Sequence, residues 1–305
     1  MILRRIWPAL SAALLGGLVA AVVAQQDMSK VEVRTEKLAD GVWVLYGAGG
    51  NIGLCSGPDG ALFIDDQYAA ISSKILAAAK SANDAPVRWV VNTHWHGDHV
   101  GGNEAMVDAG ATIIAQDRVR QRMIEGQDNK FFQRKVDPAP AKALPILTFN
   151  DSTTLHVNGQ DVVAFHVAPA HTDGDVIVWF PKANVVHMGD TFFSSTYPII
   201  DLESGGSING MVAASERVLA RIDGATRVIP GHGTVSDKAG LQRYHDMLVG
   251  TRAAVAKLVK QKKKVDEVVA AKPTTPWDDA WGNGYMKPAL YTTLLYTELA
   301  AAKLK

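Results

Sequence analysis

The chain has 305 residues, of which 47% are hydrophobic and 20% are charged, and its formal net charge is zero. This length suffices for one large domain or two small ones, with a core deep enough to shield a reaction from water. The balanced charge and the lack of a dense basic run argue against a nucleic-acid-binding protein. The single cysteine, Cys55, excludes an internal disulfide, and its apolar neighbours favour a packed thiol over a reactive one.

Residues 1–24 are predicted to form a cleaved secretory signal peptide. Arg4 and Arg5 precede an almost uncharged stretch that ends in small residues at Ala24. A membrane anchor and an additional core helix are the alternatives, but the apolar stretch is short and is interrupted by Pro8 and two glycines. We therefore expect a periplasmic or secreted protein without a stable membrane anchor. Its mature part, 25–305, is expected to be a single domain with a helical extension at about 272–305.

The first part of the mature chain is predicted to be rich in strands, with helices following. Apolar runs bounded by Gly, Pro and Asp turns predict strands at 31–36, 42–46, 52–56, 61–64, 87–92 and 112–115. Helical spacing predicts helices at 68–81, 99–109 and 116–126. The segment 127–145 is rich in proline and charge and lacks periodicity, so we interpret it as the link between two halves.

The second part repeats this organisation. Strands are predicted at 153–157, 161–167, 176–180, 184–187 and 226–229. Helices are predicted at 208–222, 237–271 and 288–303. Sheets inside and helices outside, in two comparable halves, predict an α/β protein with a four-layer αββα sandwich of two mixed β-sheets flanked by helices.

Potential metal ligands are concentrated directly after the predicted strand 87–92. Four of them lie within six residues, namely His94, His96, Asp98 and His99. Neutral imidazoles and a carboxylate are the groups that hold Zn²⁺ and similar metals, and crowding them without a cation would be costly. The sequence therefore predicts a metal site on the loop at the end of this strand.

Three further candidate ligands follow apolar runs at later strand ends, namely His171, Asp190 and His232. Gly or Pro beside each of them lets the backbone turn sharply and present the side chain to a shared cleft. Four other histidines lie inside strand or helix patterns without a second ligand nearby, and we interpret them as ordinary core or surface residues. They are His156, His166, His187 and His245.

With these residues in this order and spacing, the chain resembles the metallo-β-lactamase superfamily of zinc hydrolases over about residues 31–244. The resemblance rests on the H-x-H-x-D-H motif at 94–99, Ala170-His171-Thr172, Gly189-Asp190-Thr191 and Gly231-His232-Gly233. It implies one metal ion on His94, His96 and His171. It implies a second metal ion on Asp98, His99 and His232, with Asp190 bridging the two. The αββα sandwich is also the fold of the family.

The resemblance implies a dinuclear zinc hydrolase. Two zinc ions roughly 3.5–4 Å apart hold a bridging water and lower its pKa to about 7, so a metal-bridging hydroxide is the expected nucleophile. We expect Asp98 to orient the water and to pass its proton to the leaving group as the catalytic residue. The same ligands would also hold iron or manganese, so the sequence leaves the metal in the cell open.

The residues that follow Asp190 leave the substrate open. In the best-known zinc β-lactamases a cysteine stands at the position of Asp190 and a lysine at that of Phe193, whereas homoserine-lactone hydrolases often have a tyrosine there. Thioester hydrolases of the glyoxalase II type share the tripeptide 189–191. Because an exported enzyme meets antibiotics, we favour a β-lactamase-like enzyme that opens a small amide or lactam and confers antibiotic resistance. Lactone, ester or thioester hydrolysis, an iron-dependent thiol or oxygen redox reaction, and a non-catalytic binding protein are the alternatives.

Aromatic residues near the ligands are candidates for the substrate pocket. Trp95, Phe193 and Tyr197 are the first candidates, and Phe131, Phe132, Trp281 and Tyr285 are weaker ones. The glycine-rich turn 47–51 is either a flap over the cleft or a simple hairpin turn. We expect a small molecule as the partner, and the oligomeric state stays open.

Overall fold

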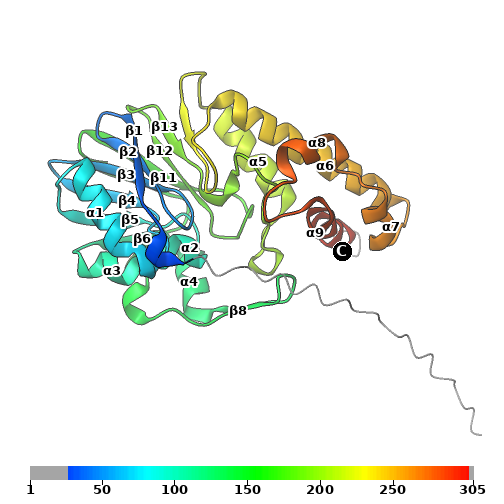
Figure 1. Cartoon of the computed structure of the whole chain (residues 1–305), viewed down its shortest axis with the longest axis horizontal. Coiled ribbons are helices and arrows are strands. Elements are labelled where there is room, and N and C mark those ends of the chain that lie inside the picture. The colour runs from blue at the N-terminus through cyan, green and yellow to red at the C-terminus, as the bar shows by residue number, and fades with distance from the viewer. Residues whose placement is uncertain (1–26, 302–305) are drawn as a thin grey trace, which may run out of the picture.

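The protein is described by a computed structural model that covers residues 27–301, so the predicted signal peptide lies outside the described residues. Two β-sheets pack face to face, and helices cover the outer side of each sheet (Figure 1). This arrangement confirms the predicted four-layer αββα sandwich.

The first sheet has seven strands in the order β1-β2-β3-β4-β5-β6-β9. Strands β1 to β4 form an antiparallel meander, and β5, β6 and β9 continue from β4 in parallel. The strands are β1 (Arg34–Ala39), β2 (Val42–Tyr46), β3 (Ile52–Gly57), β4 (Gly60–Ile64), β5 (Val87–Val91), β6 (Thr112–Gln116) and β9 (Leu147–Phe149). The helices of this half are η1 (Met28–Lys30), η2 (Ala69–Ile71), α1 (Ser72–Ala82), α2 (Gly97–Val100), α3 (Asn103–Asp108) and α4 (Asp117–Glu125).

The second sheet has five strands in chain order. They are β10 (Ser152–Val157), β11 (Gln160–His166), β12 (Val176–Phe180), β13 (Val185–His187) and β14 (Arg227–Ile229). Only the β13–β14 pair is parallel, and the others are antiparallel. The helices that follow are η4 (Gly189–Thr191), η5 (Leu202–Ser204), α5 (Ile208–Leu219), α6 (Lys238–Lys260), α7 (Val265–Ala270), α8 (Thr275–Trp281) and α9 (Pro288–Ala301).

Three apolar layers hold the sandwich together. Between the sheets, Ile64 and Val91 of the first sheet pack in one cluster with Val162 and Val178 of the second, and all four are fully buried. A second cluster joins the first sheet to α1 and α3, and a third joins the second sheet to α5, α6 and the C-terminal helices. The apolar strand residues that predicted these elements are therefore the residues that form the core.

Some predicted elements differ from the structure. The helix expected over 99–109 is divided into α2 and α3 at Gly101 and Gly102. The helix expected over 237–271 is broken into α6 and α7, because Lys262 adopts a positive φ of 60°. The side chain of Glu267 then accepts a hydrogen bond from the Lys264 backbone N–H at 2.8 Å and begins α7 as a new helix.

None of the helices within residues 27–301 combines the length and the apolar character that a membrane span requires.

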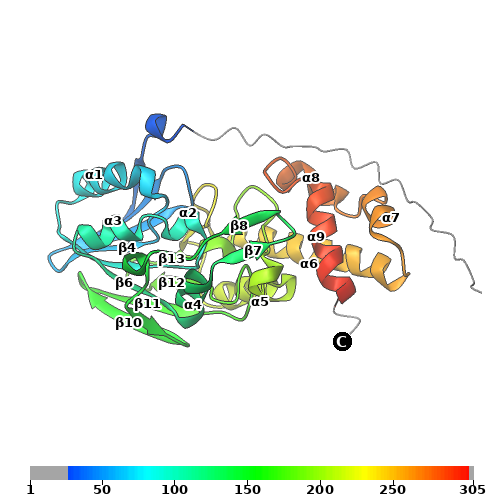
Figure 2. The same ribbon diagram turned by 90° about the horizontal axis from the view of Figure 1, so that it is seen from below.

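The segment 127–145, which was predicted to link the two halves, lies within the first half. It forms an antiparallel hairpin of β7 (Gln127–Asn129) and β8 (Arg134–Val136), then η3 (Ala141–Ala143), and the chain returns to the first sheet as β9. The hairpin lies between the sandwich and the C-terminal helices, with α9 beyond it (Figure 2). Phe131 and Phe132 at its turn pack against the apolar cluster that contains α5, α6 and α9.

Candidate metal centre

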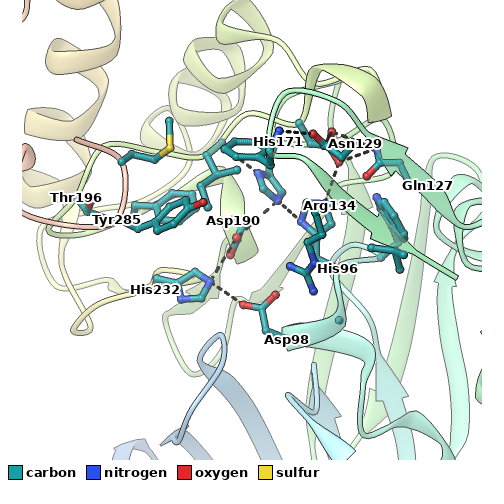
Figure 3. A pocket seen from close by; sticks show the side chains of 18 of the residues that line it. His96, Asp98, Gln127, Asn129, Arg134, His171, Asp190, Thr196, His232 and Tyr285 are labelled. Atoms are coloured by element: carbon teal, nitrogen blue, oxygen red, sulfur yellow. Dashed lines mark hydrogen bonds and ion pairs between the residues drawn. The ribbon is translucent and has the colours of Figure 1, made fainter. Parts of the chain in front are cut away.

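The seven candidate ligands converge at one edge of the sandwich. Each lies directly beyond the carboxyl end of a strand or in the loop that follows, and such ends of parallel strands meet at a shared edge. His94 and His96 follow β5, Asp98 and His99 lie in α2, His171 lies between β11 and β12, Asp190 lies in η4 after β13, and His232 follows β14. Figure 3 shows His96, Asp98, His171, Asp190 and His232 pointing toward one another.

Within residues 27–301, three groups of three potential ligands form in this cluster, and in each group the donor atoms lie within 4.8 Å of one another. Two of them are the sets that the resemblance implies, and the third, His94, His99 and Asp190, connects these two sets. In the first set, His96 Nδ1 lies 2.8 Å from His171 Nε2, and the ring of His94 lies 4.6 Å from that of His171. In the second set, Asp98 Oδ2 lies 3.2 Å from His232 Nε2 and 3.5 Å from His99 Nε2.

Asp190 lies between the two sets. Its Oδ1 is 3.1 Å from His99 Nε2, and its Oδ2 is 3.4 Å from His232 Nε2 and 3.6 Å from His171 Nε2. The carboxylate therefore faces both sets at once, which is the place that a bridging ligand would take.

The donor set fits a divalent metal of the zinc type. Within residues 27–301, the buried atom His94 Nε2 has no hydrogen-bond partner, although buried polar atoms normally have one. Burial and the neighbouring imidazole of His99 hold the pKa of His94 well below its ordinary value, and burial lowers the pKa of His171 to about 4. Both imidazoles are therefore neutral at pH 7, which is the form that binds a metal.

Hydrogen bonds fix the orientation of the imidazoles. Asp65 Oδ2 lies 2.8 Å from His99 Nδ1 and also accepts a hydrogen bond from Thr93 Oγ1 at 2.7 Å. His171 Nδ1 donates to the backbone oxygen of Ile199 at 2.8 Å. These bonds leave the Nε2 atoms of both histidines directed at the cluster, as supporting residues do in metal sites.

Asp201 supports the remaining imidazole and was not predicted from the sequence. Its Oδ2 lies 3.0 Å from His96 Nε2, which leaves His96 Nδ1 for the metal set. The carboxylate also accepts hydrogen bonds from Asn129 Nδ2 at 2.8 Å and from Gln127 Nε2 at 3.0 Å. The β7–β8 hairpin is thereby joined to the metal site through one carboxylate.

Hydrogen bonds join the glycine-rich turn 47–51 to the ligand loops. Gly50 N donates to Asp98 O at 3.1 Å, and Asn51 Nδ2 donates to Pro230 O at 2.9 Å and to Gly233 O at 2.8 Å. A Cβ at Gly50 would overlap the ring of His99. Glycine is needed here because the backbone approaches a ligand closely.

A cavity of about 500 Å³ opens above the cluster (Figure 3). Ligands form its floor, and the wall is mainly apolar, with Trp95, Phe132, Val136, Phe193, Tyr197, Ile199, Tyr285 and Met286. Phe131 and Trp281, the other aromatic candidates, do not line it. Phe193 stacks on the ring of His232 at 5.5 Å, whereas the hydroxyl of Tyr197 donates to Asp278 Oδ1 at 2.9 Å. Tyr197 is fully buried, and its hydroxyl bonds to α8.

The histidines that were interpreted as ordinary have other partners. Both ring nitrogens of buried His187 are bonded, with Nε2 at 3.0 Å from Asn51 O and Nδ1 accepting from Gly189 N at 3.1 Å. His156 is exposed and pairs with Asp161 at 2.7 Å. Cys55 is buried, and burial raises the pKa of its thiol, as expected for a packed cysteine.

Comparison with known proteins assigns the chain to a superfamily. Residues 55–232 match the model of the metallo-beta-lactamase superfamily, and the chain belongs to this superfamily. It is 25% identical over 151 residues to a metallo-beta-lactamase type 2 of Bacteroides fragilis, covering 49% of this chain and 54% of that protein. It is 29% identical over 182 residues to a hydroxyacylglutathione hydrolase of Anaeromyxobacter dehalogenans, covering 59% of each. The chain thus spans little more than half the length of these relatives.

Solved structures show the same fold. A metallo-beta-lactamase from Pontibacter korlensis superposes with a TM-score of 0.60 at 21% identity, covering 71% of this chain and 99% of that one. The DIM-1 metallo-beta-lactamase superposes with a TM-score of 0.58 at 23% identity, covering 72% of this chain and 98% of that one.

Proposed function

We propose that the protein is a dinuclear zinc hydrolase that opens a small cyclic amide, with a β-lactam as the favoured substrate. The observation that carries this proposal is the pair of ligand sets on either side of Asp190, at the floor of a cavity of about 500 Å³. A site of this size with a mainly apolar wall is suited to a small, partly hydrophobic molecule. The similarity to metallo-beta-lactamases supports the choice of a lactam over other amides.

When bound, the metal ions would lower the pKa of water to near neutrality and polarise the scissile carbonyl group. His94, His96 and His171 would hold one ion, and Asp98, His99 and His232 the other. Asp98 lines the cavity, and we assign it the role of orienting the water and accepting its proton. The oxygen then forms a bond to the carbonyl carbon, the carbon–nitrogen bond breaks, and the proton passes from Asp98 to the leaving nitrogen.

The aromatic wall would position the substrate. Trp95 is 3% exposed and is held by a hydrogen bond from its Nε1 to Ser204 Oγ at 3.1 Å, so its ring is a rigid surface beside the ligands. Phe193 presents a second rigid face, because it stacks on His232. Rigid apolar surfaces of this kind hold a ligand at low entropic cost and exclude bulk water.

Thioester hydrolysis is the second candidate. It is supported by the 29% identity to a hydroxyacylglutathione hydrolase, which is higher than the identity to the lactamase relatives. The carboxylate of Asp190 between the two ligand sets is compatible with either reaction, because it serves the metal ions rather than the substrate.

A substrate panel on the zinc-loaded mature protein tests the proposal. We expect turnover of a chromogenic cephalosporin that is abolished by a chelator and exceeds turnover of an acyl-homoserine lactone and of S-lactoylglutathione. Faster turnover of the thioester would replace the lactam with the second candidate, and no turnover of any of the three would contradict hydrolysis of these classes.

The variant Asp98→Asn should lose at least about 100-fold in kcat. Asp128→Asn, an exposed aspartate on the nearby hairpin, is the matched control.

We also propose that the protein acts outside the cytoplasm, after removal of residues 1–24. The support is the sequence pattern of Arg4, Arg5 and the apolar stretch that follows. Mass spectrometry of the N-terminus of the exported protein tests this, and a cytoplasmic protein that keeps residues 1–24 would contradict it.

A further inference from the structure

The β7–β8 hairpin has one face toward the cavity and one face toward solvent. Its strands pair Gln127 with Val136, Asp128 with Lys135, and Asn129 with Arg134. Side chains alternate between the two faces of a strand. Gln127, Asn129, Arg134 and Val136 accordingly all line the cavity, whereas Asp128 and Lys135 do not.

The position of this face is fixed relative to the metal site. Gln127 and Asn129 both donate to the carboxylate of Asp201, and the same carboxylate holds His96. Asn129 Oδ1 also accepts a hydrogen bond from Phe132 N at 2.9 Å, which fixes the turn of the hairpin. The residue opposite Asn129 in the register, Arg134, is therefore carried on a backbone that is anchored to a candidate ligand.

Of the described residues that line the cavity, Arg134 is the only lysine or arginine. In the described part of the chain, residues 27–301, no carboxylate forms an ion pair with its guanidinium, whereas neighbouring Lys135 pairs with Asp137 at 3.3 Å. A guanidinium presents a planar set of donors that matches the two oxygens of a carboxylate. The cavity thus offers one unpaired cation beside an apolar wall and above the ligand cluster.

We propose that Arg134 binds a carboxylate group of the substrate, and that the hairpin thereby selects anionic substrates. This inference rests on the proposed function, because it places the scissile amide at the ligand cluster and the substrate's carboxylate at the hairpin. The expected substrate carries a negative charge, an apolar group for the Trp95 and Phe193 side of the cavity, and a hydrolysable bond between them.

Two measurements on the zinc-loaded protein test the inference. The first compares kcat/KM for a cephalosporin and for its methyl ester in the wild type, Arg134→Met, Arg134→Lys and Lys135→Met. Loss of a charged, bidentate contact is expected to lower kcat/KM for the acid by about 10- to 100-fold, mainly through KM. The ester should be unaffected, Arg134→Lys should recover part of the loss, and Lys135→Met should behave as the wild type.

The second measurement follows binding of 4-phenylbutyrate and of its neutral amide by tryptophan fluorescence. We expect Arg134→Met to weaken binding of the acid by about 10-fold or more and to leave binding of the amide unchanged. Equal loss of binding for acid and amide would overturn the inference. So would an unchanged kcat/KM or unchanged binding for the acid. If the wild type hydrolyses no cephalosporin but binding of 4-phenylbutyrate still depends on Arg134, the lactam proposal fails and the anion site is supported.

Discussion

Replacing Asp201 with asparagine is expected to weaken the metal set of His94, His96 and His171 and to leave the other set in place. The carboxylate is ionised, because its hydrogen bonds with His96 and Ser204 outweigh burial and hold its pKa below its ordinary range. Oδ2 faces His96 Nε2 at 3.0 Å and Ser204 Oγ at 2.7 Å, and Oδ1 faces Asn129 Nδ2 at 2.8 Å and Ser204 N at 3.2 Å. All four of these groups donate hydrogen bonds to the Asp201 carboxylate.

An asparagine keeps one acceptor oxygen and turns an NH₂ group toward the donors on the other side. Two buried donors would then lose their acceptor in either orientation, at a cost of about 1–3 kcal/mol each. The Ser204 hydroxyl can rotate to another acceptor. The remaining cost is therefore expected to appear as a shift of the ligand-loop backbone and of the His96 ring. Loss of such a supporting partner typically weakens a metal site by about 10- to 100-fold.

Zinc competition against a chromogenic chelator measures this effect site by site. We expect one of the two zinc affinities of Asp201→Asn to fall by about 10- to 100-fold and the other to stay within about 3-fold. Asp173→Asn is the matched control, because Asp173 lies in the loop of His171 and pairs with Arg122 at 2.8 Å, and within residues 27–301 its carboxylate has no hydrogen bond or ion pair with a candidate ligand. Unchanged affinities at both sites would refute the assignment of Asp201 as the support of His96.

Three further predictions concern Gly50, bound zinc and Glu298. Gly50→Ala should destabilise the fold by about 1–3 kcal/mol and weaken one zinc site in chelator competition, because the new Cβ overlaps the His99 ring. Gly97→Ala, the control, has open space around the new Cβ and should change neither stability nor zinc binding. Chelation of a zinc-loaded sample should lower Tm, since ligand at 100 times its Kd stabilises the native state by about 2.7 kcal/mol, and a Tm that is insensitive to zinc would contradict binding to the folded state. Burial raises the pKa of Glu298 above its ordinary value of 4.5, although this carboxyl accepts hydrogen bonds from Ile208 N and Ser207 Oγ. The folded state then holds the proton more tightly than the unfolded state, so this contribution to stability is present below pH 4.5 and is lost as pH rises through the folded pKa. Urea unfolding at several pH values should show that loss in the wild type and not in Glu298→Gln, and parallel pH profiles would rule the explanation out.

The fold and the ligand cluster could be predicted because both depend on local patterns. Continuous apolar runs identified the buried strands, and a ligand at the end of a run, such as His171 or Asp190, marks the edge where strands end. The same rule would also have identified Asp65, which directly follows β4 and supports His99, had it been applied to carboxylates without a neighbouring histidine.

The hairpin could not be predicted because its stability is not local. Its strands have three residues each and no apolar alternation, and Gln127 and Asn129 are held by Asp201, which is more than 70 residues away in the sequence. Asp201 itself lies outside any strand or long helix, so no periodicity singles it out. The break between α6 and α7 depends on one residue with positive φ, Lys262, a residue type that rarely adopts that conformation.

Zinc content, measured by elemental analysis on matched samples of the wild type, His171→Ala and His232→Ala, tests the dinuclear centre most directly. We expect about two zinc ions per chain in the wild type and about one in each variant, because each histidine belongs to a different ligand set. A wild type that binds a single ion, or a variant that keeps both, would contradict a centre built from these two sets.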